Sequence, residues 1–172
     1  VHEMPFLSGF DGTQMHWPEN LLRDLSKIDK IAALKEDAKD PETTIKALNL
    51  EPDIRVIIAG RKSYVRQFWQ HGAKAYLNGI SMVDARIGLA FEKAMLNDDF
   101  KTQNRIINEL EAVFFDNSVT KFGWHRTNKA LLEAAGFFKR FERLPLTSLT
   151  EEEMVQVNND YHKIEQALRD FF

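Results

Sequence analysis

A single lysine has the sequence context of a Schiff-base nucleophile. Lys35 ends the short apolar run at residues 31–35, whose composition favours a buried β-strand. Because side chains alternate along a strand, Lys35 shares a face with Ala33. An amine that projects from a strand end into a partly desolvated pocket loses its proton more easily and becomes nucleophilic. The alternative is a solvated lysine beside Glu36 and Asp37, which the spacing alone leaves open.

Neither a metal ion nor an organic cofactor is predicted. The histidines at positions 16, 71 and 162 do not have the spacing of metal ligands. The turns after the predicted strands lack the G-x-G-x-x-G and Walker patterns of nucleotide sites. The absence of cysteine excludes disulfides and thiolate chemistry and fits a reducing, cytoplasmic environment.

The composition is that of a globular protein with a sizeable core. Hydrophobic residues make up 44% of the 172 residues and charged residues 28%. The 23 basic and 26 acidic side chains give a formal charge of -3 and are not clustered by sign, so neither a nucleic acid nor a membrane surface is a predicted partner. No apolar run approaches the length needed to span a bilayer.

The predicted elements fall into two blocks. Four β-rich runs alternate with helical segments, at residues 1–4, 31–35, 54–59 and 73–81. Continuous apolar runs separated by helices are typical of parallel strands covered on both faces. From residue 98 onward the apolar spacing predicts only helices, with segments at 99–116, 125–135 and 150–171. Local signals predict three helix ends: a start at Asp40-Pro41, a stop at Gly72, and a capping box formed by Thr150 and Glu153.

Two architectures fit four consecutive parallel strands: a doubly wound sheet and part of a (β/α)₈ barrel. A doubly wound nucleotide-binding sheet usually carries a glycine-rich turn after its first strand. Because no such turn occurs here, the barrel is the preferred interpretation.

Several segments resemble the dihydrodipicolinate synthase / N-acetylneuraminate lyase family. The string IAALKEDAKD at 31–40 is similar to the family's sixth barrel strand, which ends in the Schiff-base lysine. The segments VHEMPFLSG, IIAGRKS and GAKAYLNGIS resemble the fifth, seventh and eighth strands, and NKALLE and RLPL resemble the helices after the barrel. The resemblance implies an α/β fold: the C-terminal half of a TIM barrel (strands five to eight, residues 1–97), followed by a C-terminal helical extension at residues 98–172.

The resemblance also implies a function and a set of site residues. The family uses a class I aldolase-type mechanism, in which a lysine forms an imine with a 2-keto acid or sugar acid and the imine accepts electrons. On this chain Lys35 is the nucleophile, and Gly60, Ile80 and Ser81 line the pocket mainly through backbone groups. The family's quaternary structure implies a homo-oligomer.

Departures from the family pattern bear on the chemistry. The tyrosine that relays protons is replaced by His2, and the next position, usually asparagine, holds Glu3. A histidine can transfer protons near neutral pH, so His2 is a second candidate catalytic residue, with a structural role as the alternative. Leu7 stands where the lysine-biosynthesis members carry arginine, which favours another keto-acid or sugar-acid lyase or dehydratase. The pair Asp11 and Gly12 is interpreted as a turn.

Four strands make only half of a barrel. We therefore expect the missing N-terminal half, or a second copy of the chain, to complete the fold, and we expect the isolated chain to be inactive. The alternative function is a catalytically inactive homologue that binds a keto acid or serves as an assembly module.

Overall fold

The computed structural model describes residues 1–5 and 15–172. Within it the chain forms two compact units, Val1–Gly79 and Ile80–Phe172. Two features considered above, Leu7 and the expected turn at Asp11-Gly12, lie outside the described residues.

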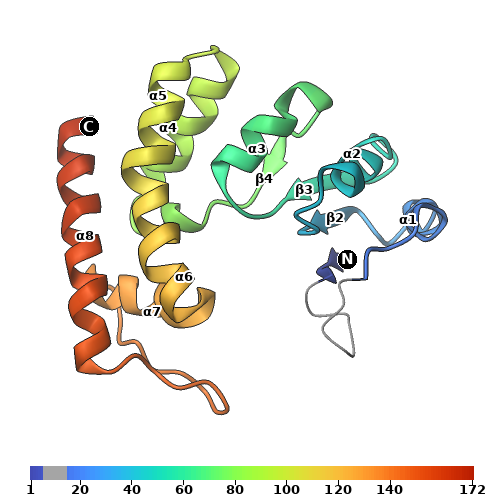
Figure 1. The fold of residues 1–172 in the computed structure, drawn as a ribbon. Helices are drawn as coiled ribbons and strands as arrows, with labels where there is room; N and C mark the ends of the chain where they lie inside the picture. The colour runs from blue at the N-terminus through green and yellow to red at the C-terminus, as the bar shows by residue number, and fades with distance from the viewer. Residues whose placement is uncertain (6–14) are drawn as a thin grey trace. The chain divides into compact units, whose positions relative to one another are not determined.

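The first unit contains a four-stranded parallel sheet (Figure 1). Its strands are β1 (His2–Glu3), β2 (Ala33–Glu36), β3 (Arg55–Ile58) and β4 (Ala75–Tyr76). The spatial order β1-β2-β3-β4 is also the order along the chain. A doubly wound sheet reverses its strand order at a switch point, whereas a barrel does not, so this order favours the barrel.

The helices of this unit begin and end where local signals predict. They are α1 (Glu19–Ser26), α2 (Pro41–Leu48) and α3 (Lys62–Phe68), and α3 continues as the 3₁₀ turn η2 (Trp69–His71). The carboxylate of Asp40 caps α2 by accepting the N–H of Thr43 at 2.8 Å, and proline follows at the first helical position. Gly72 ends η2 with a φ of 94°, a left-handed conformation that glycine adopts without strain.

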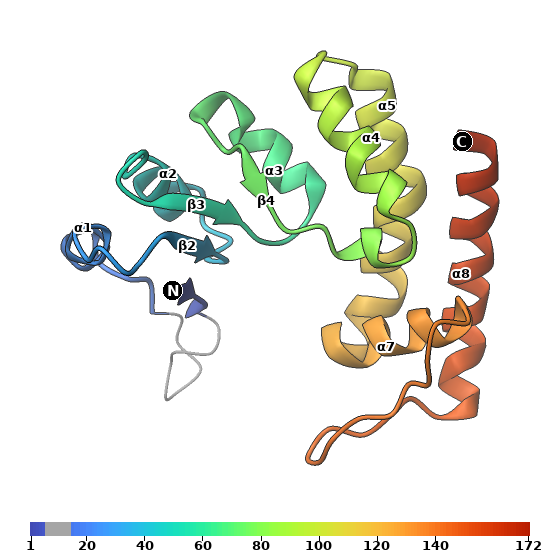
Figure 2. The same ribbon diagram turned by 180° about the vertical axis from the view of Figure 1, so that it is seen from behind.

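Burial alternates along the strands. Leu34, Val56 and Ile58 are completely buried on one face of the sheet, and the apolar side chains Val65 and Phe68 of α3 are buried as well. Both ribbon views show α2 and α3 on the same side of the strands (Figure 2). The other face carries the partly exposed residues of each strand, among them Lys35. The core of the first unit therefore lies between the sheet and its helices.

The last strand is shorter than the sequence predicted. An extended run was expected over residues 73–81, but β4 covers only Ala75–Tyr76. The 3₁₀ turn η3 (Gly79–Met82) then bends the chain, and α4 (Ala85–Leu96) follows.

The second unit is helical throughout its described residues. After α4 come α5 (Phe100–Arg105), the π-helical segments η4 (Ile106–Glu111) and η5 (Val113–Val119), and then α6 (Thr120–Phe122), α7 (Trp124–Ala134) and α8 (Glu151–Phe171). The predicted capping box is present at the start of α8, between Thr150 and Glu153. No helix in the described part of the chain is long and apolar enough to cross a membrane.

The π-helical winding corrects the prediction of an ordinary α-helix at 99–116. Among the buried side chains there, Ile106, Leu110, Phe114 and Ser118 recur at every fourth residue. A four-residue repeat lies between the 3.6 residues per turn of an α-helix and the wider turns that i→i+5 hydrogen bonds give, so it is compatible with either winding. The domain boundary expected between residues 97 and 98 remains a prediction. The two compact units divide between Gly79 and Ile80, so α4 belongs to the helical unit.

Candidate functional site

Two of the candidate residues stand next to each other on the open face of the sheet. The Cα atom of Lys35 pairs in register with that of His2 on one side and that of Ile57 on the other. Register partners in neighbouring parallel strands point to the same face. Lys35 is partly exposed, and its amine makes no hydrogen bond or ion pair with another described residue. None of the described residues therefore occupies this amine.

The imidazole of His2 faces a carboxylate. Its Nε2 atom lies 3.5 Å from Oδ2 of Asp37, within ion-pair range but long for a hydrogen bond. Asp37 follows Lys35 by two residues, so strand alternation brings it to the same face. The sequence interpretation treated Asp37 only as a solvated neighbour of the lysine. The strand alternation that singled out Lys35 also predicts that Asp37 lies on the same face.

The residue after Lys35 anchors the turn that follows the strand. Glu36 is completely buried, and its carboxylate accepts the N–H of Ala38 at 2.6 Å and the hydroxyl of Thr44 at 3.0 Å. The Thr44 hydroxyl also lies 2.7 Å from that of Tyr64 in α3. Burial raises the pKa of Glu36 to about 6, against the lowering effect of its hydrogen bonds. Burial likewise raises the pKa of Tyr64 to about 12, which keeps this phenol neutral.

A second carboxylate is buried on the neighbouring strand. Glu3 pairs in register with Glu36 and is also completely inaccessible to solvent. Its Oε1 atom accepts the N–H of Trp17 at 2.8 Å, while its Oε2 atom is buried without a hydrogen-bond partner. Because alternation turns Glu3 away from the face of His2, this carboxylate does not line the open face.

The remaining predicted site residues lie in two places. Gly60 follows the end of β3, the strand beside Lys35, with a φ of 106° that disfavours any side chain. A Cβ atom built there would meet nothing within 4 Å, so open space lies in front of this backbone. Ile80 and Ser81 belong to η3 in the second unit, where Ile80 is completely buried and the Ser81 hydroxyl is buried without a hydrogen-bond partner.

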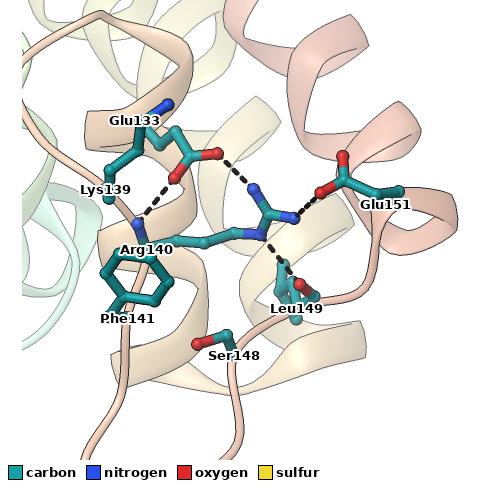
Figure 3. Close-up of a pocket in the computed structure, with 7 residues that line it drawn as sticks. All are labelled: Glu133, Lys139, Arg140, Phe141, Ser148, Leu149 and Glu151. Atoms are coloured by element: carbon teal, nitrogen blue, oxygen red, sulfur yellow. Dashed lines mark hydrogen bonds and ion pairs between the residues drawn. The ribbon is translucent and has the colours of Figure 1, made fainter.

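The helical unit contains a hollow that is crossed by hydrogen bonds and ion pairs of Arg140. It encloses about 420 Å³ and is lined by Glu133, Lys139, Arg140, Phe141, Ser148, Leu149 and Glu151 (Figure 3). The guanidinium of Arg140 crosses it and binds the carboxylates of Glu133 and Glu151 and, at 2.8 Å, the carbonyl of Leu149. Through these contacts Arg140 ties the ends of α7 and α8 together, and each of its three nitrogens already donates one bond within the protein.

The described residues offer no metal centre. Residues 1–5 and 15–172 contain no group of three or more histidine, aspartate or glutamate side chains arranged to hold an ion. The groups that the described residues bring to the open face are an amine, an imidazole and a carboxylate.

Solved structures with the same fold are known. A dihydrodipicolinate synthase from Bacillus anthracis shares 25% identity with a TM-score of 0.72, over 84% of this chain and 49% of that chain. A dihydrodipicolinate synthase from Bacillus clausii (19% identity, TM-score 0.72) aligns over 86% of this chain and 51% of that one. An N-acetylneuraminate lyase from Aliivibrio salmonicida (20% identity, TM-score 0.62) aligns over 93% and 52%. The chain thus spans about half the length of the solved structures that it matches.

These matches confirm the predicted fold class, the C-terminal half of a TIM barrel followed by a helical region. No curated protein matches the chain in sequence. The model of the dihydrodipicolinate synthetase family, however, matches residues 2–164, nearly the whole chain. With its parallel strands in barrel order and this match, the chain belongs to the dihydrodipicolinate synthetase family.

Proposed function

We propose that the protein is a class I aldolase-type lyase or dehydratase that acts on a 2-keto acid or sugar acid through an imine at Lys35. The observation that carries this proposal is the placement of the Lys35 amine on the open face, in register with His2 and without a partner among the described residues. Family membership supports the reaction class, and the names of the matched structures, two synthases and a lyase, support carbon–carbon bond chemistry.

In the proposed reaction the neutral Lys35 amine attacks the carbonyl carbon of the keto acid, and water leaves to form an imine. The protonated imine accepts the electron pair of the bond that breaks at the adjacent carbon. In lyase chemistry the hydroxyl proton at the far carbon passes to a base as that bond breaks, and His2 stands on the correct face to receive it. The cleavage leaves an enamine, and the proton held by the base passes to its carbon to give the imine of the product. Hydrolysis of that imine releases the product keto acid and returns the free amine.

Asp37 and Gly60 have supporting roles in this proposal. The Asp37 carboxylate, 3.5 Å from Nε2 of His2, orients the imidazole. The open backbone at Gly60 contributes backbone groups to the wall of the pocket. The expected contribution of Ile80 and Ser81 remains a prediction. Substrate identity would be decided by side chains that face the part of the keto acid beyond its carbonyl.

The sheet needs further strands to enclose this chemistry. The matched structures have chains about twice as long, and the face that carries Lys35 is open in the described residues. We propose that the other half of the barrel comes from an N-terminal part of the protein or from a second copy. The 172-residue chain alone is then inactive, since imine chemistry needs an enclosed pocket that excludes bulk water.

We further propose a cytoplasmic homo-oligomer. The absence of cysteine supports the location. Large exposed apolar side chains between α7 and α8, including Phe141 at 76% and Leu144 at 89% exposure, support contact with another copy. Light scattering on the full protein tests this: a monomer at every concentration would rule it out.

The experiment that tests the proposed function is reductive trapping. Borohydride is added to the full protein with pyruvate, and the modified peptides are located by mass spectrometry. Reduction of the imine leaves an adduct with the mass of pyruvate less one oxygen atom. An adduct at Lys35 supports the proposal. No adduct, combined with thermal stabilisation by keto acids, would instead favour the inactive binding homologue.

A further inference from the structure

The carboxylate behind Lys35 is held by hydroxyl groups from two helices. Glu36 in β2 is completely buried, and the hydroxyl of Thr44 in α2 lies 3.0 Å from its Oε2 atom. The Thr44 oxygen in turn lies 2.7 Å from the hydroxyl of Tyr64 in α3. A strand and two helices thus contribute one side chain each to a chain of hydrogen bonds. The reaction proposed above gives none of these three side chains a role, although Glu36 directly follows Lys35.

The direction of these hydrogen bonds follows from the number of protons. Thr44 carries one hydroxyl proton, and its oxygen lies 3.0 Å from two acceptors, the Glu36 carboxylate and the carbonyl of Asp40. Because an ionised carboxylate and a carbonyl cannot donate, Tyr64 must donate to the Thr44 oxygen for the Thr44 proton to reach either of them. The pKa of Tyr64, which burial raises to about 12, keeps the phenol proton in place. Tyr64 therefore acts on Glu36 through Thr44.

The other oxygen of Glu36 shapes the turn that carries Asp37. Glu36 Oε1 accepts the N–H of Ala38 at 2.6 Å, which closes a short loop with Asp37 between its ends. Asp37 Oδ2 lies 3.5 Å from Nε2 of His2. The carboxylate that Thr44 holds in place thus fixes the backbone on both sides of Asp37. A displacement of Glu36 would move Asp37 relative to His2.

Both hydroxyl groups are anchored by packing. Thr44 is completely buried, and the Tyr64 ring packs edge to face against Phe68, with 4.8 Å between the ring centroids and 70° between the ring planes. Phe68 is itself only 1% exposed. The places of the two hydroxyls are therefore set by α2 and α3, and the hydrogen bonds convey this constraint to Glu36.

We propose that Thr44 and Tyr64 are positioning residues for proton transfer on the open face. Their hydroxyls hold the Glu36 carboxylate, the carboxylate holds the turn at residues 36–38, and the turn places Asp37 against the imidazole of His2. Neither residue touches the substrate, since both act from behind the sheet, where Glu36 is buried. The proposal rests on the function proposed above, because it assigns a role in the same reaction.

Three substitutions remove or keep individual hydroxyls. Thr44→Val removes the hydroxyl without changing the branched shape of the side chain, Thr44→Ser keeps it, and Tyr64→Phe removes only the phenol oxygen. Thr127→Val is the matched control, because Thr127 is also completely buried and its hydroxyl donates to the carbonyl of Ser118 at 3.1 Å in the helical unit. A mere loss of stability would therefore affect Thr127→Val in the same way as Thr44→Val.

Pyruvate is the probe, and two rates are measured on the full protein at about pH 8, where Glu36 with its pKa of about 6 is ionised. Borohydride trapping reports imine formation at Lys35. Exchange of the pyruvate methyl protons for deuterium from heavy water reports proton transfer. A base takes a proton from the methyl carbon of the imine, the electron pair of that bond forms the double bond of an enamine, and a deuteron then adds to the same carbon. In the proposed reaction His2 is this base.

Thr44→Val should slow deuterium exchange by about tenfold, the factor for loss of one hydrogen bond, while the trapping rate stays within about twofold of wild type. Thr44→Ser and Thr127→Val should keep the wild-type ratio of the two rates. Tyr64→Phe should lower the ratio of exchange to trapping as well. The double variant with both Thr44→Val and Tyr64→Phe should lower it no further than Thr44→Val alone, because Tyr64 acts through Thr44.

The backbone amide of Ala38 gives a readout that needs no activity. Its hydrogen exchange should be about tenfold faster in Thr44→Val than in wild type, because the Glu36 carboxylate that accepts this N–H is no longer held. Exchange of the same amide should be unchanged in Thr44→Ser and in Thr127→Val. Full protection of Ala38 in Thr44→Val would overturn the role of the hydrogen-bond chain.

The rates separate a positioning role from a structural one and from failure of the proposed function. Equal losses of trapping and exchange in Thr44→Val, or an equal loss of exchange in Thr127→Val, would overturn the positioning role. An adduct without exchange in wild type would leave the imine and remove the proton transfer that the two residues support. If wild type gives neither, the lyase function fails and takes the positioning role with it, while Ala38 still reports on the hydrogen-bond chain. If Thr44→Val does not fold, Tyr64→Phe provides the same comparison, since it removes the donor to Thr44 and keeps the ring.

Discussion

His2 and Lys35 are register partners in adjacent parallel strands, so an imidazole and an amine project from the same face of the sheet. The register of a strand pair fixes which side chains meet, because a slip by one residue would turn one of them to the opposite face. Here that slip would replace His2 by the buried Glu3. The relationship between the two candidate catalytic residues therefore depends on the packing behind them.

Replacement of His2 should separate bond breaking from imine formation. In His2→Phe, kcat for keto-acid turnover should fall by about 10²–10⁴-fold, the usual contribution of a general acid–base group. Hydride trapping at Lys35 should continue, since the amine is unchanged. The control is His125→Phe at an exposed position of α7. Steady-state kinetics in which His2→Phe retains the wild-type kcat would remove the proton-transfer role.

The buried face of β2 should dominate the stability of the sheet unit. Leu34 is completely buried, so Leu34→Ala should lower the free energy of unfolding by about 2–5 kcal/mol through lost burial and a residual cavity. The control is Leu89→Ala in α4, where the side chain is 67% exposed and the expected change is within about 0.5 kcal/mol. Urea unfolding measures both. Equal effects would mean that Leu34 does not pack as described.

A buried carboxylate should hold α8 against η5. Both oxygens of Asp160 accept hydrogen bonds, from the hydroxyl of Ser118 at 2.7 Å and from the amides of Asn117 and Gln156 at 3.1 Å. Asp160→Asn turns one acceptor into a donor, which should cost on the order of 2 kcal/mol. Asp170→Asn, at an exposed position of the same helix, should be neutral in thermal unfolding. A similar melting temperature for both variants would contradict the assignment.

The stability of the fold should depend on pH through Glu36. Burial raises its pKa from 4.5 to about 6 in the folded chain, so the folded chain holds this proton more tightly than the unfolded chain. The resulting stabilisation is complete below about pH 4.5 and is lost as the pH rises through about 6, a change of about 2 kcal/mol. Chemical unfolding of wild type and Glu36→Gln at several pH values measures this difference. A difference between the two that stays constant across the window would contradict it.

Local signals in the sequence were sufficient for much of the fold. Asp40 before Pro41 predicted the start of α2, Gly72 predicted the end of η2, and Thr150 with Glu153 predicted the capping box of α8. Each of these depends on groups within a few residues, so its physical cause is visible in the sequence. The alternation that placed Lys35 opposite the core is equally local.

Other features depend on contacts between distant residues. The bond from Thr44 to Glu36 and the contact of Tyr64 with Thr44 require three elements to be in place, and no sequence spacing encodes them. The π-helical winding of η4 and η5 was missed because an every-fourth-residue apolar stripe also suits an α-helix over a few turns. The pairing of His2 with Asp37 needed the strand register, which the sequence did not provide.

The role of Lys35 is tested most directly by locating the lysine that forms the imine. The full protein is reduced with borohydride in the presence of pyruvate, and the adduct is mapped in wild type, Lys35→Arg and the exposed-lysine control Lys30→Arg. We predict a single adduct at Lys35 in wild type and in Lys30→Arg, and none in Lys35→Arg. An adduct at another lysine, or one that survives in Lys35→Arg, would contradict the central claim.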